Sequence, residues 1–202
     1  MLLCGIINEL NKSMSKTDQL SYFFCQATDL RINNATAVLR GLLYLLVSRQ
    51  SSLVSHIREK HDHAGKALFD DANTWVALSE IFTNILQDPS LNSTYFIINA
   101  LDECVIDLLK LLDFIVLISS ISSRVKWIVS SRNEAYIEQR LQLNDSGIRL
   151  SLELKENTVQ VSRAVNIYID RCLSELPEIK YNQLLLDSAR KKIQQKANST
   201  FL

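Results

Sequence analysis

The stretch 95–104, which reads YFIINALDEC, restricts the possible folds more than any other part of the sequence. Residues 95–98 are strand-forming and do not alternate between apolar and polar positions. This pattern is typical of a strand buried on both faces, as in a parallel sheet covered by helices. Asn99, Asp102 and Glu103 then follow at the carboxyl end, the edge where open α/β sheets bind ligands. The stretch predicts a site for a metal or an oriented water, although a helix start that tolerates acids explains it equally well.

Strands and helices are expected to alternate around this stretch. Strands are predicted at 22–26 and 125–129, and 148–154 alternates as a strand does. Helices are predicted at 1–10, 38–49, 52–60, 73–86, 105–118 and 134–141, then from 158 to Pro177 and over 181–197. The sequence therefore predicts a parallel-sheet α/β core over residues 1–155, followed at 156–202 by the start of a small all-α domain that is truncated.

Charge and cysteine usage exclude several classes of protein. Twenty-two basic residues balance 22 acidic ones, so no overall field recruits nucleic acid or anionic lipid. Four single cysteines suit a reducing compartment, where each is expected to be a small core residue. The apolar run 108–118 is too short to span a bilayer. We expect a soluble, cytoplasmic protein without nucleic-acid or membrane partners.

A second motif, VKWIVSSRNE at 125–134, is also a predicted strand that is followed by polar residues. A right-handed crossover would place its carboxyl end beside that of the 95–104 strand. Arg132 could then bind a terminal phosphate, and a preceding serine could orient water or a metal. Alternatively, Arg132 pairs with Glu134 or Glu138 at a helix start. The two motifs in this order favour a nucleotide site.

Several segments together resemble a known family. These segments are similar to the NACHT domain of fungal STAND-type P-loop NTPases, and they read FIINALDEC, VKWIVSSRN, LSLEL and VSRAVNIYI. The family includes heterokaryon-incompatibility-like and nephrocystin-3 N-terminal-like proteins. The resemblance implies a P-loop NTPase core followed by small helical domains. It also implies ATP- or GTP-dependent switching of a signalling receptor, with Mg²⁺ as the metal.

The resemblance, together with the serine that precedes Arg132, gives five expected site residues. Asn99, Asp102 and Glu103 fall on the Walker B element, and Arg132 falls on the sensor 1 arginine. Asp102 and Glu103 are thus the expected catalytic residues, Asp102 and Asn99 the expected metal ligands, and Arg132 and Ser131 the expected nucleotide-binding residues.

Two departures from the family pattern limit this expectation. The first ten residues, MLLCGIINEL, resemble the helix that follows the family's G-x-x-x-x-G-K-[ST] loop. The chain nevertheless has no glycine in such a loop, and its four glycines are Gly5, Gly41, Gly65 and Gly147. Losing three charged hydrogen bonds costs roughly 4.5 to 9 kcal/mol, so the chain alone should not bind nucleotide usefully. Asn99 stands where many relatives have an aspartate, and its neutral amide is a weaker Mg²⁺ ligand.

Two functions remain open at this stage. The first is a partial NACHT domain, cut at both ends and without independent hydrolysis, whose partners are missing effector and repeat regions. The alternative is a non-enzymatic interaction module or decoy that pairs with full-length NACHT proteins or with itself.

Overall fold

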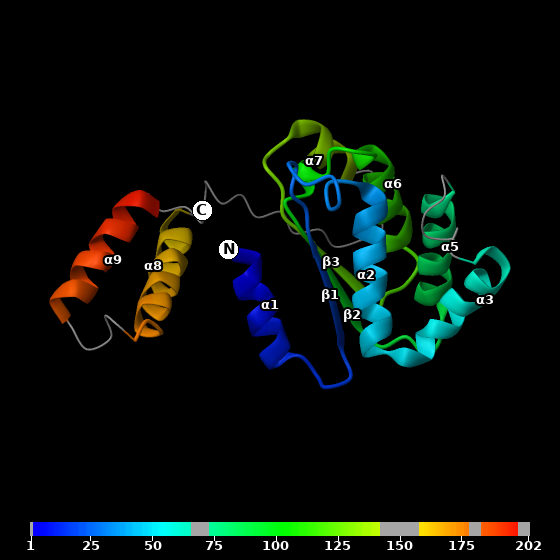
Figure 1. Ribbon diagram of the computed structural model, residues 1–202, viewed down its shortest axis with the longest axis horizontal. Coiled ribbons are helices and arrows are strands. Elements are labelled where there is room, and N and C mark those ends of the chain that lie inside the picture. Colours follow the sequence, from blue (N-terminus) through cyan, green and yellow to red (C-terminus); the bar gives the residue numbers. More distant parts are fainter. Residues whose placement is uncertain (1, 66–72, 142–157, 178–182, 198–202) are drawn as a thin grey trace. The chain divides into compact units, whose positions relative to one another are not determined.

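A computed structural model of the 202-residue chain describes residues 2–65, 73–141, 158–177 and 183–197 (Figure 1). The chain divides into two compact units. One is Gly5–Gly147, and the other combines Met1–Cys4 with Ile148–Leu202.

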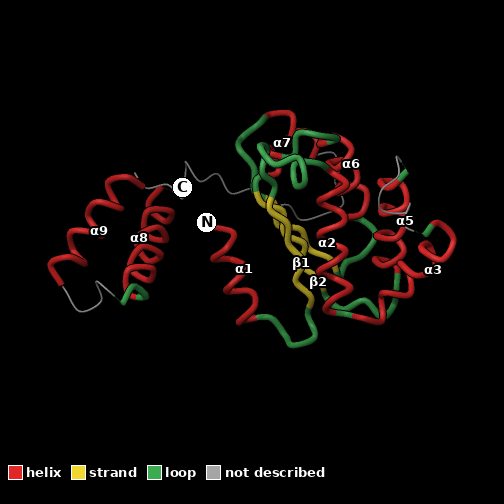
Figure 2. The backbone as a smooth tube through the Cα atoms, viewed as in Figure 1, coloured by secondary structure: helices red, strands yellow, loops and turns green. Residues whose placement is uncertain are grey.

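In the described residues, the larger unit is built on a parallel sheet of three strands, in the order β1-β2-β3 (Figure 2). The strands are β1 (Gln19–Phe24), β2 (Thr94–Asn99) and β3 (Val125–Val129). Gln19 pairs with Thr94, and Thr94 pairs with Val125, so the three strands begin and end nearly level. The predicted α/β class with a parallel sheet is confirmed. The strand predicted at 148–154 lies outside the described residues.

Helices connect and follow the strands. The larger unit contains most of α1 (Leu2–Ser13), then α2 (Ala35–Arg49), α3 (Val54–Ala64), α5 (Thr74–Gln87), α6 (Leu108–Ser119) and α7 (Ala135–Leu141). Short 3₁₀ turns lie at Ser51–Leu53 and Leu101–Glu103. The smaller unit contains α8 (Thr158–Ser174) and α9 (Gln183–Ala197). Each predicted helix is present, with shifts of a few residues at its ends.

Two element starts differ from the prediction for identifiable reasons. The prediction placed the first strand at 22–26, but β1 begins at Gln19, whose amide donates to Ser93 O at 2.7 Å. Backbone pairing here outweighs the polar side chains. The prediction started a helix at 105, but Ile106 bridges to Asn34 and Asp107 has a φ of 60°. Helix α6 therefore begins only at Leu108.

A hydrophobic core fixes the sheet against helices α2, α5 and α6, which lie on one side of it in Figure 1. Phe96 of β2 and Trp127 of β3 stack with ring centroids 4.8 Å apart. The ring centroid of Phe82 of α5 lies 5.0 Å from that of Phe96. Helix α2 approaches β1 so closely that a Cβ on Gly41 would lie 2.4 Å from the Phe23 ring. The sheet is thus a rigid support for the residues at its ends.

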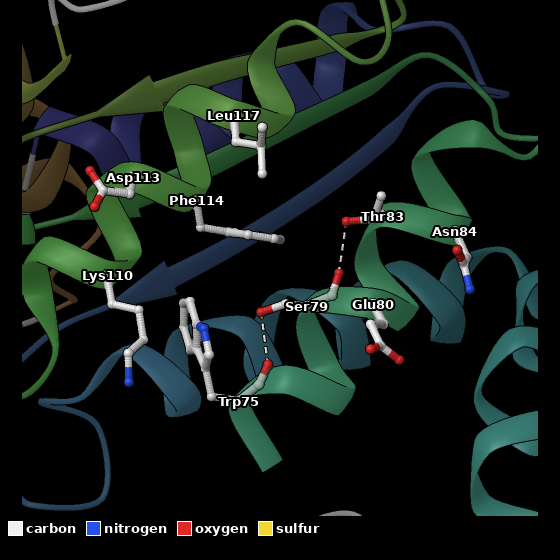
Figure 3. Close-up of a pocket in the computed structure, with 9 residues that line it drawn as sticks. All are labelled: Trp75, Ser79, Glu80, Thr83, Asn84, Lys110, Asp113, Phe114 and Leu117. Atoms are coloured by element: carbon white, nitrogen blue, oxygen red, sulfur yellow. Dashed lines mark hydrogen bonds between the residues drawn. The ribbon is translucent and has the colours of Figure 1, made fainter. Parts of the chain in front are cut away.

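A groove of about 480 Å³ lies between α5 and α6. Figure 3 shows Trp75, Phe114 and Leu117 facing this groove, with Lys110 beside the indole. The Lys110 ammonium lies 5.7 Å from the Trp75 ring centroid. None of the predicted site residues lines this groove.

The smaller unit has a core of its own. Val165, Ile169 and Leu173 of α8 are buried and pack with Ala189 of α9. The pair is joined at its surface by an ion pair, in which Arg190 Nε lies 2.6 Å from Asp170 Oδ1. Among the described helices, none has the length and apolar character needed to cross a membrane.

Candidate functional site

The parallel sheet brings the ends of β2 and β3 together, as the two motifs predict. Ser130, the residue after β3, joins them. Its Oγ donates to Asn99 Oδ1 at 2.9 Å and accepts from Ala100 N at 3.0 Å. Its carbonyl accepts from Leu101 N at 2.8 Å. Asn99 is thereby held by a hydroxyl, and the chain beyond it is fixed at the edge of the sheet.

A left-handed residue turns the chain immediately after β2. Ala100 has a φ of 54°, which is uncommon for a residue with a side chain. The 3₁₀ turn Leu101–Glu103 follows, with Leu101 buried beneath it. Leu101 anchors the turn in the core, while the Asp102 and Glu103 carboxylates contact neighbouring loops.

Asp102 faces the loop that follows β3 and binds Arg132 twice. Its Oδ1 accepts from the Arg132 backbone amide at 2.9 Å, and its Oδ2 accepts from Arg132 Nε at 2.6 Å. The Asp102 side chain is only 7% exposed, whereas that of Arg132 is 74% exposed. Arg132 thus has a carboxylate partner that sequence reasoning did not consider, and much of its guanidinium faces solvent.

Glu103 and Ser131 are the sequence neighbours of the two residues in this ion pair. The Glu103 carboxylate turns toward the loop after β1, where its Oε2 accepts from Ala27 N at 3.0 Å. Asn33 supports the same loop by donating from Nδ2 to Ala27 O at 3.0 Å. Ser131 is exposed next to Arg132. The structure therefore brings all five predicted residues to one edge of the sheet.

Two buried cysteines meet below this edge. Cys25 follows β1, Cys104 follows the 3₁₀ turn, and both residues are buried. The hydrogen bond with Cys104, burial, and the charges of Glu103 and Asp102 all raise the pKa of the Cys25 thiol. Cys25 is therefore a protonated thiol at neutral pH.

The oxygen atoms at this edge are of the kind that binds Mg²⁺, but in the described part of the chain too few of them gather to form a complete metal site. Carboxylate and amide oxygens of Asp102, Glu103 and Asn99 are the hard ligands that Mg²⁺ prefers. No group of three or more acidic, histidine or cysteine side chains gathers in a metal-binding arrangement among the described residues. A Mg²⁺ held at this edge would therefore need waters and phosphate oxygens as further ligands.

Sequence reasoning missed two features of the site. It did not identify Ser130 as the bridge between strands, although the Ser-Ser-Arg sequence contains it. It also did not pair Cys25 with Cys104, because a single cysteine in each segment gives no signal of contact across the fold.

The fold and this edge define an α/β protein with acidic, amide and guanidinium groups at the carboxyl ends of adjacent parallel strands. More closely, the chain belongs to the family described as nephrocystin 3, N-terminal, whose family model matches residues 1–132. The matched region contains all five predicted site residues. The resemblance to nephrocystin-3 N-terminal-like proteins is confirmed.

One curated relative extends the comparison to the whole chain. The vegetative incompatibility protein HET-E-1 of Podospora anserina is 55% identical over 203 residues, covering 100% of this chain and 15% of the relative. The chain thus spans a small part of the length of the curated relative that it matches. No solved structure matches the chain.

Proposed function

We propose that this chain supplies the Mg²⁺ and water side of a nucleotide-binding switch in a NACHT-type signalling protein. The observation that carries the proposal is the contact between Asp102 and Arg132 across adjacent strand ends in a member of this family. Asp102, with Asn99 beside it, would hold Mg²⁺, and Glu103 would orient water. Arg132 and Ser131 would bind the terminal phosphate.

The exposures of the two partners support this division of roles. Asp102 is almost fully covered and accepts the Arg132 backbone amide, so its position does not depend on the Arg132 side chain. The Arg132 guanidinium is largely exposed and can turn from the carboxylate to a phosphate oxygen. Such an exchange frees Asp102 Oδ2 as the phosphate arrives. Bound Mg²⁺ would supply charge neutralisation at the phosphates.

The phosphate-cradling loop has to come from outside these 202 residues, because none of the four glycines lies in a G-x-x-x-x-G-K-[ST] motif. The chain alone is therefore expected to bind MgATP or MgGTP on the order of a thousandfold more weakly than a form that carries the loop. The relative's name records vegetative incompatibility. We propose that this chain serves a signalling response of that kind.

The test compares the chain with a form extended at its N-terminus by a strand and a G-x-x-x-x-G-K-[ST] loop. Binding of fluorescent ATP and GTP analogues and release of phosphate are measured for both. In the extended form, Arg132→Ala should reduce the preference for triphosphate over diphosphate, and Glu103→Gln should slow hydrolysis without weakening binding. Arg140→Ala is the matched control, because Arg140 pairs with Asp113 away from this edge.

Two results would count against the proposal. One is an extended form that folds but binds neither nucleotide. The other is equal loss of binding in Arg132→Ala, Glu103→Gln and the control Arg140→Ala, which would show that the changes act on the fold. An in-frame loop motif upstream in the gene would link the extended form to the natural product.

A non-enzymatic interaction module is the second candidate, and the sheet favours it in one respect. Within the described part of the chain, β3 pairs with β2 alone, so its other edge has backbone groups without a strand partner. Such an edge can accept a strand from another chain. Sedimentation of the chain, alone and with the matching segment of HET-E-1, tests this. A monomer that ignores that segment would remove the basis for this candidate.

A further inference from the structure

The loop between β1 and α2 contacts the Glu103 carboxylate through Ala27. The Ala27 amide donates to Glu103 Oε2 at 3.0 Å, and the Ala27 carbonyl accepts from Asn33 Nδ2 at 3.0 Å. Ala27 is exposed, and its methyl side chain offers little with which to anchor the loop. The two backbone groups of Ala27 therefore connect Asn33 on one side to Glu103 on the other.

Asn33 is the fixed end of this series of contacts. Only 3% of the residue is exposed, and its carbonyl accepts from Ile106 N at 3.1 Å. The next residue, Asn34, forms a parallel bridge with Ile106 and caps α2, where its Oδ1 accepts from Ala37 N at 2.8 Å. The side chain that reaches Ala27 is thus carried by a buried backbone that is attached both to α2 and to the segment just beyond Glu103.

One atom of Asn33 is not explained by packing. Its Oδ1 is buried and has no hydrogen-bond partner among the residues that the structure describes. A buried oxygen without a partner is unfavourable, and an apolar residue of the same shape avoids that cost. Asparagine at this position is therefore better explained by the donor that it directs at Ala27 than by the stability of the core.

The two neighbouring carboxylates are held from different sides of the edge. Asp102 accepts from the amide and Nε of Arg132 in the loop after β3. Glu103 accepts from Ala27 in the loop after β1, and this contact is exposed. A hydrogen bond from a mobile loop would hold a long side chain poorly, because both groups would lose entropy on pairing. The buried Asn33 fixes the loop on which the Glu103 contact depends.

We propose that Asn33 is a positioning residue for Glu103. It fixes Ala27, and the Ala27 amide then sets where the Glu103 carboxylate lies. The inference rests on the proposed role of Glu103 in orienting water, and it gives that role a support outside the two sequence motifs. Asp102 should not depend on Asn33, because its partner atoms lie in the loop after β3.

Amide hydrogen exchange in the full chain tests the positioning without nucleotide. Exchange is followed by NMR at the Ala27 amide, which binds Glu103, and at the Arg132 amide, which binds Asp102. Glu103→Ala should speed exchange at Ala27 about tenfold, as expected for the loss of one hydrogen bond to a charged group. Asn33→Leu should speed exchange at Ala27 to a similar extent and leave exchange at Arg132 unchanged.

Two controls separate positioning from stability. Asn33→Leu keeps the branched shape and removes the unpartnered oxygen, so its urea midpoint should stay close to that of the parent chain. Asn34→Ala removes the α2 cap from the same loop, so it should lower the midpoint without speeding exchange at Ala27. If Asn33→Leu does not fold, Asn33→Ser, whose side chain is smaller, is measured in its place.

Three results in the full chain would overturn the proposal. The first is exchange at Ala27 that stays at the parent rate in the Asn33 variant. The second is faster exchange at Ala27 and Arg132 together, which would show a general loosening of the edge. The third is an equal effect of Asn34→Ala on Ala27, which would show that any destabilisation of the loop is sufficient.

The extended form that carries the G-x-x-x-x-G-K-[ST] loop links the positioning to hydrolysis. Asn33→Leu should slow phosphate release toward the rate of the Glu103→Gln form, without weakening binding of the fluorescent nucleotide analogues. In a Glu103→Gln background it should have no further effect, because the group that it positions is already changed. Unchanged phosphate release in Asn33→Leu would overturn the inference. An extended form that folds but releases no phosphate would count against the proposed function alone, because exchange at Ala27 is measured without nucleotide.

Discussion

Removing the Asp102 side chain is expected to destabilise the larger unit more than removing that of its partner, Arg132. Asp102→Ala deletes the acceptor of the Arg132 amide as well as the carboxylate of the ion pair. A hydrogen bond to a charged group contributes about 1.5 kcal/mol at the low end of its range. An ion pair with a 74% exposed guanidinium adds about 0.2 to 1 kcal/mol. Asp102→Ala should therefore cost about 2 kcal/mol, and Arg132→Ala less than about 1 kcal/mol.

Urea unfolding followed by tryptophan fluorescence measures this difference. Both tryptophans of the chain, Trp75 and Trp127, lie in the unit Gly5–Gly147, so the signal reports on that unit. The double variant should give a coupling energy of about 0.2 to 1 kcal/mol. Arg140→Ala, which removes an exposed ion pair with Asp113, should leave the midpoint unchanged. Equal losses for the two single variants, or a larger loss for Arg132→Ala, would refute the reasoning.

Three further changes test the fold around the site. Gly41→Ala should destabilise the larger unit by up to about 2 kcal/mol, because the clash with the Phe23 ring costs more than the higher helix propensity of alanine contributes. When Phe23 is replaced by leucine, urea unfolding should show no loss of stability from Gly41→Ala. His56 and the Ser90 amide hold the pKa of Asp88 at about 2, so this group stabilises the fold above about pH 4 and loses that contribution as the pH falls toward about 2. Asp88→Asn should make the free energy of unfolding less dependent on pH between about 2 and 4. The same pH dependence in the variant and the parent protein would contradict this role of Asp88. Arg124→Lys should cost about 1 to 2 kcal/mol by thermal unfolding, because a lysine cannot reproduce the guanidinium contacts to three backbone carbonyls; an unchanged melting temperature would count against this.

Sequence reasoning located the strands because their hydrophobic patterns are strong. The predicted strand at 125–129 coincides with β3, and the run at 95–98 lies inside β2. It placed the start of β1 too late, since Gln19 and Ser21 look unlike strand residues. Both are nevertheless buried, and Ser21 donates to Leu42 O at 2.6 Å, a contact across the fold. Local pattern alone could not supply that partner.

The same distinction applies to the site. The order of the two motifs predicted that Asp102 and Arg132 would come to one edge of the sheet, because crossover handedness restricts the topology. Which atoms then pair could not be predicted, because it depends on the left-handed turn at Ala100 and on the loop after β3. The contact between Glu103 and Ala27 was missed for a related reason, since it joins residues far apart in the chain.

The spacing of the strands along the chain also determines the order in which the site can assemble during folding. Paired residues of β2 and β3 are about 30 residues apart, whereas those of β1 and β2 are about 75 apart. Closing the longer loop costs roughly 0.8 kcal/mol more entropy, and the described helices α2, α3 and α5 must also dock within it. We therefore expect the half of the edge with Asp102 and Arg132 to form early, and the β1 side with Cys25 to join late. A nascent chain would thus hold its ion pair before its two buried thiols meet.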